Sequence, residues 1–373
     1  MDTGPFLKKQ IITYMGNKRK LIKDISNIIE LIKTELGNTL TSADAFSGSG
    51  IVSRLLKTES HILYSNDIAG YSETLNRCFL STPTKKEQKI IENIINDANT
   101  FAYGSGSGGA PKWIRLHWAP TGKIQAEHRA YFTEKNALLI DKYMFFINTL
   151  NGGIPDKYKC YLLAMLLVKS SMHNNTNGQF SAFYKDESGV GKYGGKKEID
   201  IKRITKDIIL EQPIFSPNKC KIHISRMDSL KWVQEIPEVD VMYLDPPYNK
   251  HPYSIYYFML DIINEWNTDV IIPDTNRGQP KDWFRSNYNS SVNAETTFTE
   301  LIGKIKAKFI VLSYNNKGII PIKNLEKILE KKGKVYKYPV DHKTYNKLKG
   351  IASYKRTAEW EDVKEFIWLV DTR

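Results

Sequence analysis

The stretch that most restricts how this chain can fold is residues 239–248, Val-Asp-Val-Met-Tyr-Leu-Asp-Pro-Pro-Tyr. Its first six residues are mostly apolar and predict a buried β-strand, and the tandem prolines predict that the strand ends there. Open α/β sheets bind their ligands at the carboxyl ends of the strands. The four residues that follow the strand are therefore predicted to form a site: Asp245, Pro246, Pro247 and Tyr248.

Each residue of this turn has its own chemical capacity. Asp245 can accept a hydrogen bond from an amine, the two prolines present carbonyls that no helix or ladder uses, and Tyr248 has a flat face for stacking. This combination suits an exposed amino-nucleobase. The alternative is a buried strand that simply ends in a turn, which tandem prolines often mark.

A second segment, residues 40–56, predicts a strand, a tight turn and a helix. Gly48 and Gly50 allow positive φ and close approach of the backbone to a ligand, and apolar residues follow from Ile51 at helical spacing. Asp67 closes the next predicted strand, about 20 residues after the loop, where βαβ units bind ribose hydroxyls. The alternative for Asp67 is a helix N-cap.

Together and in this order, the motifs resemble those of DNA methyltransferases that methylate an exocyclic amino group, above all N6 of adenine. Asp245-Pro246-Pro247-Tyr248 resembles their catalytic motif, and the resemblance spans roughly residues 11–80 and 165–320. The segments that resemble their S-adenosylmethionine-binding motifs are the N-terminal turn Tyr14-Met15-Gly16-Asn17-Lys18, the loop Asp44-Ala45-Phe46-Ser47-Gly48-Ser49-Gly50, and the strand end at Asp67. Tyr253 to Tyr257 and Ser313 to Asn316 also resemble family segments.

The resemblance implies an α/β, Rossmann-like methyltransferase fold with a mostly parallel sheet. Residues 335–340 and 366–370 are predicted to close it as an antiparallel C-terminal hairpin. Asp228 resembles the family residue near the cofactor adenine, but it can equally cap the helix predicted from Ser229, and both interpretations stay open. For Lys18, the alternative to cofactor binding is ordinary solvated charge.

About 160 residues separate the helix after Asp67 from the strand that begins at Val239, far more than one βα unit needs. We therefore expect an inserted target-recognition lobe, with catalytic core on either side of it. The predicted domains are 1–80 and 219–373 for the core and 81–218 for the lobe. The Gly/Ser run at 104–109 predicts a solvated loop.

Several residues are predicted to contact DNA. Asn and Gln can read adenine bidentately in the major groove, while lysines contact phosphate; the alternative for each asparagine is a polar loop rich in turn formers. The candidates are Asn174, Asn175, Gln179, Lys185, Lys192 and Arg277, with Lys196 and Lys197 as further phosphate contacts. The basic and aromatic stretch from Trp113 to Arg129 suits DNA contact as well, with a core hairpin as the alternative for its tryptophans.

A net charge of +13 is consistent with an acidic partner, here double-stranded DNA. The three cysteines, far apart and odd in number, argue against a disulfide framework and a zinc cluster and favour a reducing cytoplasm. We expect no metal, no signal peptide and no membrane span, and a monomer or weak dimer.

The expected reaction is direct methyl transfer from S-adenosylmethionine to N6 of a flipped adenine, with Asp245 and the Pro246 carbonyl orienting the amine. Such enzymes commonly pair with a restriction endonuclease that acts on the same site. An N4-cytosine methyltransferase, which usually has Ser at the Asp245 position, and an RNA or protein methyltransferase with a related motif are alternatives. A nucleic-acid-binding protein with an inactive cofactor fold is a third.

Overall fold

The computed structural model describes residues 4–104, 109–149, 155–195, 198–281, 284–340 and 363–373. The chain forms two compact units, each assembled from three separate stretches of sequence. Unit 1 contains the described residues of Met1–Gly16, Ala69–Pro217 and Tyr253–Phe284. Unit 2 contains those of Asn17–Ile68, Asn218–Pro252 and Arg285–Arg373.

Unit 2 is an α/β unit built on one seven-stranded sheet with the order β3-β2-β1-β4-β5-β7-β6. Five strands are parallel, and β7 pairs antiparallel with both β5 and β6. The strands are β1 (Leu40–Asp44), β2 (Ser60–Asp67), β3 (Lys221–Arg226), β4 (Val239–Leu244), β5 (Ala307–Asn315), β6 (Lys334–Val340) and β7 (Glu365–Asp371). The strand order reverses between the neighbours β1 and β4, which is where such sheets bind their ligands.

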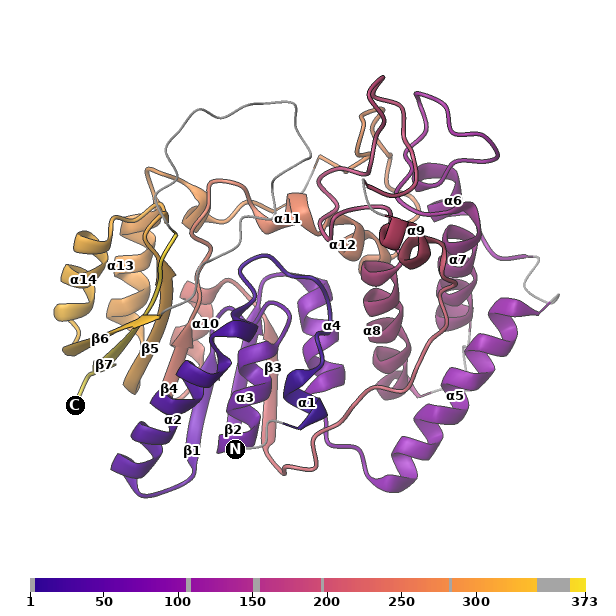
Figure 1. The fold of residues 1–373 in the computed structure, drawn as a ribbon. Helices are drawn as coiled ribbons and strands as arrows, with labels where there is room; N and C mark the ends of the chain where they lie inside the picture. The colour runs from indigo at the N-terminus through magenta and orange to yellow at the C-terminus, as the bar shows by residue number, and fades with distance from the viewer. Residues whose placement is uncertain (1–3, 105–108, 150–154, 196–197, 282–283, 341–362) are drawn as a thin grey trace. The chain divides into compact units, whose positions relative to one another are not determined.

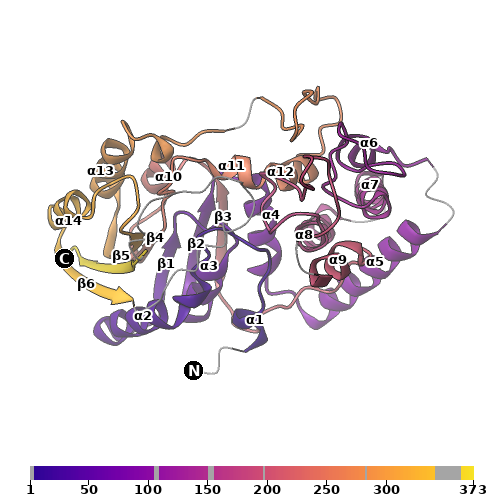
Figure 2. The same ribbon diagram turned by 45° about the horizontal axis from the view of Figure 1, so that its top comes forward.

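Helices cover both faces of this sheet, as Figures 1 and 2 show. Helices α10 (Ser229–Glu235), α13 (Ala294–Lys304) and α14 (Ile322–Glu330) pack on the face that carries Met242, Leu244 and Trp368. The opposite face carries Asp44 and Ser65, and both of these side chains bond to Ser53 of α3 (Ile51–Glu59). This second face is therefore more polar close to β1.

Unit 2 begins at Asn17, and the chain then forms a short 3-10 helix, η1 (Lys18–Lys20), and α2 (Ile22–Leu36). The isoleucines that line one face of α2, among them Ile25, Ile28 and Ile32, are almost fully buried. Burying such a side chain contributes roughly 1.5–3 kcal/mol. A second 3-10 helix, η3 (Asn287–Asn289), precedes α13.

The predicted Rossmann-like methyltransferase fold is confirmed. Every strand predicted from apolar runs is present, including the closing antiparallel pair of β6 and β7. The β4 strand ends at Leu244, directly before Asp245, because the prolines that follow cannot donate ladder hydrogen bonds.

Within the residues that the structure describes, the regular elements of unit 1 are all helices, joined by long loops, one of which contains an isolated bridge between Lys185 and Gly191. Figure 2 shows α5, α7 and α8 side by side, and these three helices contact one another. The helices are α1 (Pro5–Lys8), α4 (Gly70–Phe79), α5 (Lys85–Tyr103), α6 (Trp113–Trp118), α7 (Glu134–Thr149), α8 (Asp156–Met172), α9 (Glu198–Thr205), α11 (Tyr253–Tyr256) and α12 (Phe258–Glu265). Their shared core includes Phe258, Leu260, Ile262 and Ile263, which the sequence predicts as packing residues.

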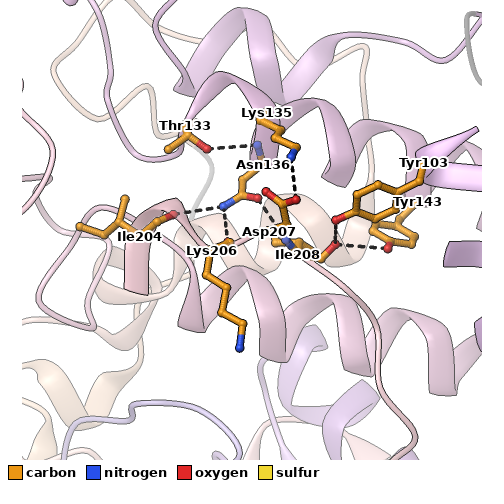
Figure 3. Close-up of polar contacts among 9 residues, drawn as sticks. All are labelled: Tyr103, Thr133, Lys135, Asn136, Tyr143, Ile204, Lys206, Asp207 and Ile208. Carbon is orange, nitrogen blue, oxygen red and sulfur yellow. Dashed lines mark hydrogen bonds and ion pairs between the residues drawn. The ribbon is translucent and has the colours of Figure 1, made fainter. Parts of the chain in front are cut away.

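The segment after α9 is held to this helical core by a buried amide, as Figure 3 shows. The side chain of Asn136 on α7 donates to the carbonyls of Ile204 (3.2 Å) and Lys206 (3.0 Å) and accepts from the amide of Ile208 (3.1 Å). The hydroxyls of Tyr103 and Tyr143 both donate to the carbonyl of Ile208 at 3.2 Å. These bonds provide partners for buried backbone groups that would otherwise have no hydrogen bond.

The division into units differs from the predicted domain boundaries. Residues 69–80 and 253–284, which were assigned to the catalytic core, pack with the helical unit, as do the described residues up to Gly16. The physical reason is that α4 and α12 bury their apolar faces against α8 rather than against the sheet. The assignment of residues 81–218 to target recognition stays a prediction.

The tryptophans of 113–129 do not form a core hairpin: Trp113 and Trp118 are buried at the two ends of the short helix α6. Most of the Gly/Ser run, 105–108, and both Lys196 and Lys197 lie outside the described residues. No helix in the described part of the chain is long and apolar enough to cross a membrane.

Candidate active site

The Asp-Pro-Pro-Tyr turn lies at the carboxyl end of β4, as predicted. The Asp245 side chain is 19% exposed, but its Oδ1 atom is buried, so the exposed part of the side chain lies elsewhere. Tyr248 is only 7% exposed, and its ring meets Tyr314 edge-on at 5.5 Å between centroids. The Tyr248 carbonyl accepts a hydrogen bond from the Ile319 amide at 3.1 Å, which holds the end of the turn.

A buried lysine of η1, Lys18, contacts the Asp-Pro-Pro-Tyr turn. The Lys18 ammonium lies 2.9 Å from Asp245 Oδ1 and 5.2 Å from the centroid of the Tyr248 ring, and the side chain is 3% exposed. Because Lys18 is buried, its charge is not simply solvated. Its neighbours in η1, Arg19 and Lys20, are exposed. The structure pairs this residue with Asp245, and its predicted contact with the cofactor stays a prediction.

The two charges of this pair affect each other's protonation. Burial raises the pKa of Asp245 to about 6, although the positive charge of Lys18 opposes the shift. Burial is the largest effect on the pKa of Lys18 and lowers it. The charge of Asp245, with smaller contributions from Tyr248, Glu365 and Tyr243, outweighs burial, and the pKa ends well above its usual range. Lys18 is therefore a stable cation, and Asp245 is an acceptor that titrates just below neutral pH.

The glycine-rich loop has the conformation that its sequence predicts. Gly48 and Gly50 have φ values of +50° and +77°, a region that strongly favours glycine. The Gly48 amide donates to Asp67 Oδ2 at 2.7 Å, so the loop is tied to the end of β2. Gly50 then begins α3 as its N-cap.

Asp44 lies beneath this loop in the interior. Its carboxylate accepts from the Ser53 hydroxyl at 2.6 Å and from the Phe46 amide at 3.3 Å, and burial raises its pKa to about 7. Asp44 therefore joins β1, the loop and α3. Ser49 is buried, while Phe46 is half-buried and meets Tyr288 edge-on at 5.3 Å.

The structure separates the two helix-cap alternatives. Asp67 is not the N-cap of α4, because Ala69 holds that position and makes no side-chain cap bond. Asp228 is the N-cap of α10, with its Oδ1 accepting from the amides of Leu230 (3.0 Å) and Lys231 (3.3 Å). Because both cap bonds go to Oδ1, capping leaves Oδ2 available to a ligand.

The N-terminal turn is anchored in unit 1 by two tyrosines. The ring of Tyr14 stacks on Tyr257 and Tyr253 with centroids 4.7 Å and 5.3 Å apart. The Met15 amide donates to the Tyr257 hydroxyl at 2.6 Å, and the Tyr253 hydroxyl donates to the Met15 carbonyl at 3.1 Å. The chain then continues through Gly16, with φ of +70°, and Asn17, whose side chain caps η1. The tyrosines were noted in the sequence as a family segment, but this anchoring function was not predicted.

These groups fit S-adenosylmethionine. A loop with positive φ allows close backbone approach, the half-buried carboxylate of Asp67 can accept from ribose hydroxyls, and Asp228 Oδ2 can accept from an adenine amine. All of them lie at the carboxyl ends of β1, β2 and β3. Among the described residues, no group of three or more His, Cys, Asp or Glu side chains is placed to hold a metal ion.

Two predicted base-reading residues are interior instead. Asn174 and Asn175 are fully buried. The Asn174 amide donates to the carbonyls of Ser170 and Ser171, while that of Asn175 donates to the carbonyls of Ala130 and Lys192. The prediction is wrong for this conformation because both side chains already hold the backbone of the loop.

The other predicted DNA contacts remain accessible. Gln179 is half-buried and forms no side-chain hydrogen bond with the residues that the structure describes. Lys192 is exposed, Lys185 lies over the Phe183 ring at 5.1 Å, and Arg277 is half-buried. The Arg277 carbonyl accepts from the Trp118 indole at 3.0 Å, which joins its loop to α6.

A Rossmann-like sheet with a glycine loop and carboxylates at its strand ends is the arrangement of an S-adenosylmethionine-dependent methyltransferase. The comparisons with known proteins make the class specific. The sequence model of the D12 class N6 adenine-specific DNA methyltransferases matches residues 14–328. The chain belongs to this family, and it is a site-specific DNA methyltransferase that acts on adenine and uses S-adenosylmethionine.

Full-length relatives support this assignment. The Type II methyltransferase M.NlaIII of Neisseria lactamica is 25% identical over 96% of this chain and 99% of its own. The Type II methyltransferase M.CviAII of Paramecium bursaria Chlorella virus 1 is 25% identical over 96% of this chain and 98% of its own. The modification methylase LlaI of Lactococcus lactis subsp. lactis is 27% identical over 84% of this chain, which corresponds to 47% of its length.

Proposed function

We propose that this methyltransferase acts on an adenine flipped out of double-stranded DNA, and that Asp245 accepts a hydrogen bond from its N6 amine. The observation that carries the proposal is the ion pair between Lys18 and Asp245 Oδ1 at the end of β4. Lys18 engages the buried oxygen of Asp245 and keeps the carboxyl ionised. The other oxygen is thereby left to the amine.

The chain's own contribution to the reaction is orientation. S-adenosylmethionine, when bound, supplies an electrophilic methyl group on sulfur. Asp245 and the Pro246 carbonyl accept from the two N–H groups of the amine and so turn the nitrogen lone pair out of the adenine ring. Pro247 keeps the turn rigid, and Tyr248 contacts the flipped base. Such alignment lowers the activation free energy of methyl transfer, because the reactants lose translational and rotational entropy on binding and not in the chemical step.

The proposed cofactor contacts follow the geometry of the loop. Asp67 accepts from the ribose hydroxyls, and Gly48, Ser49 and Gly50 let the backbone approach the ligand. Asp228 accepts from the adenine amine of the cofactor through Oδ2. Asp44 does not contact the cofactor in this proposal but holds the loop through its hydrogen bond with the Phe46 amide. The half-buried ring of Phe46 contacts the cofactor. By resemblance, the turn from Tyr14 to Asn17 contacts the methionine end.

For DNA, we propose that Gln179 reads a base while Lys185, Lys192 and Arg277 contact phosphate. This assignment is supported by accessibility, because the Gln179 amide is uncommitted and Lys192 is exposed. Asn174 and Asn175 instead shape the loop that carries Gln179. Its fixed geometry begins at Gly178, where φ is +102° and a Cβ atom would lie 2.5 Å from Thr13.

We also propose that the enzyme is the modification partner of a restriction endonuclease with the same recognition site, and that it acts as a monomer or weak dimer in the cytoplasm. The partnership is supported by two relatives, M.NlaIII and M.CviAII, which are named as Type II methyltransferases. DNA methylated by the purified enzyme should then resist cleavage by the endonuclease of the same host. Unchanged cleavage after complete methylation would contradict the pairing.

The main test is incubation with labelled S-adenosylmethionine and mixed-sequence DNA, followed by nucleoside analysis. The expected product is N6-methyladenine, whereas N4-methylcytosine or DNA binding without transfer would contradict the proposal. Asp245→Ala should abolish transfer and leave binding of the neutral product S-adenosylhomocysteine, measured by calorimetry, nearly intact. Asp269→Ala, at an exposed position of unit 1, is the mutational control. Substantial turnover by Asp245→Ala would remove Asp245 from its proposed role.

A further inference from the structure

A second carboxylate lies near the Lys18–Asp245 pair, and none of the motifs predicts it. Glu365 is the first residue of β7, and it is 8% exposed. Its Oε2 atom is buried and has no hydrogen-bond partner among the residues that the structure describes. A buried carboxylate oxygen without a donor is unfavourable unless a nearby charge or a ligand compensates for it.

The register of the sheet puts Glu365 on the same face as Asp245. Leu244 pairs with Leu312, so Asp245 comes level with Ser313 on β5. On the other side of β5, Ser313 pairs with Ile367 and Asn315 pairs with Glu365. Because side chains alternate along strands, the side chains of Asp245, Ser313 and Glu365 share one face. The antiparallel direction of β7 brings its first residue to the edge where the parallel strands end.

The charge of Glu365 reaches the residues of the site. It acts to raise the pKa of Asp245, although burial of Asp245 is the larger cause of that shift. It also acts to raise the pKa of Lys18, after the larger effects of burial, which lowers it, and of Asp245. Glu365 and Asp245 therefore both act on one buried ammonium group.

We propose that Glu365 is a positioning residue that completes a carboxylate–ammonium–carboxylate cluster with Lys18 and Asp245. The inference rests on the proposed role of Asp245 in holding the amine. Two carboxylates and one ammonium leave the cluster with one net negative charge. Glu365 helps to hold Lys18 in place, and Lys18 in turn orients Asp245.

A net negative cluster has a consequence for the cofactor. The methyl carbon must come within bonding distance of the amine that Asp245 holds, so the sulfonium cation binds close to the cluster. A fixed negative charge near a cation in a partly buried site strengthens its binding. The product S-adenosylhomocysteine is a neutral sulfide at that atom. Glu365 should therefore favour the cofactor over its product.

The first arm of the test measures the affinities of S-adenosylmethionine and S-adenosylhomocysteine by calorimetry without DNA. Glu365→Gln should weaken binding of S-adenosylmethionine about three- to tenfold and change that of S-adenosylhomocysteine by less than about twofold. Glu365→Asp, which keeps the charge, should retain most of the preference. Glu326→Gln is the matched control because Glu326 lies on α14, over the opposite face, where it pairs with Lys337 and the Trp368 indole.

The second arm measures the acid limb of kcat/KM against pH. The titratable groups that act on Asp245 or share its surroundings are Lys18 on η1, Tyr243 on β4, Asp44 on β1, Tyr248 in the turn and Glu365 on β7. Removing the negative charge of Glu365 stabilises ionised Asp245. The acid limb should therefore move to lower pH by roughly half a unit to one unit in Glu365→Gln, and it should not move in Glu326→Gln.

The outcomes distinguish the cluster from a purely structural carboxylate. Equal loss of affinity for the two cofactor forms, with an unmoved acid limb, would mean that Glu365 only supports the fold and would overturn the proposal. An unchanged preference between the two forms would do the same. If Asp245→Ala retains transfer, the proposed role of Asp245 fails, whatever the Glu365 variants do. If Asp245→Ala is inactive and Glu365→Gln resembles wild type in both arms, only the inference about Glu365 fails.

Discussion

Replacing Lys18 by methionine should move the pH dependence of the enzyme to higher pH. The Lys18 ammonium lies 2.9 Å from Asp245 Oδ1, and it opposes the effect of burial on the pKa of this carboxyl, which is about 6. An opposite charge at such a distance lowers a carboxyl pKa by about 1–3 units. Without it, the pKa of Asp245 should rise by roughly 1–3 units.

The sign of the effect follows from the proposed role of Asp245. The ionised carboxylate accepts from the amine, so activity is present above the pKa of Asp245 and is lost as the pH falls through it. In wild type this loss should occur near pH 6. In Lys18→Met, a pKa near 8 would leave roughly a quarter of the molecules ionised at pH 7.5. The variant should therefore recover activity as the pH is raised to about 9.

The assay is steady-state kcat/KM from pH 5 to 9.5, because this quantity reports the pKa values of the free enzyme. Lys20→Met is the control, since Lys20 belongs to the same turn but is exposed. Circular dichroism across the pH range should show that both variants remain folded. An acid limb at the wild-type pH in Lys18→Met would refute the argument. The predicted shift is opposite in direction to that of Glu365→Gln.

Three further predictions concern the cofactor, DNA reading and stability. Asp67→Ala should weaken S-adenosylmethionine binding by roughly 1–3 kcal/mol in calorimetry, because it removes a charged acceptor; unchanged affinity would exclude Asp67 from the site. Gln179→Ala should cost about 1–3 kcal/mol of discrimination at one base pair, measured by sequencing methylated products from a random library. Asn175→Ala should instead reduce thermal stability, and normal stability with altered site preference would restore it as a base reader. Asn136→Ala should lower the free energy of unfolding by about 1–3 kcal/mol or more, because it leaves the buried Ile204 carbonyl and the buried Ile208 amide without the hydrogen bonds that Asn136 makes. A wild-type denaturant midpoint would contradict this.

The side chains and turns that follow each strand were readable from local sequence. Tandem prolines end β4 at Leu244 whatever surrounds them, because proline cannot donate a ladder hydrogen bond. Gly48 and Gly50 predict a turn, because few other residues adopt positive φ. The apolar runs that became β5 and β7 were visible for the same reason, since burial on both faces of a sheet requires them. The conformations of the glycine loop and of the Asp-Pro-Pro-Tyr turn were therefore predictable.

Tertiary structure decided which of those side chains meet. Lys18 and Asp245 are more than 200 residues apart in sequence, and only the fold pairs them. Glu365 has no motif around it, and its position depends on the antiparallel register of β7, which a strand pattern does not specify. Asn174 and Asn175 resembled base readers because their amides suit bases and backbone carbonyls alike. Both side chains are buried and bond to backbone carbonyls, because a polar group inside a protein needs a hydrogen-bond partner within the protein.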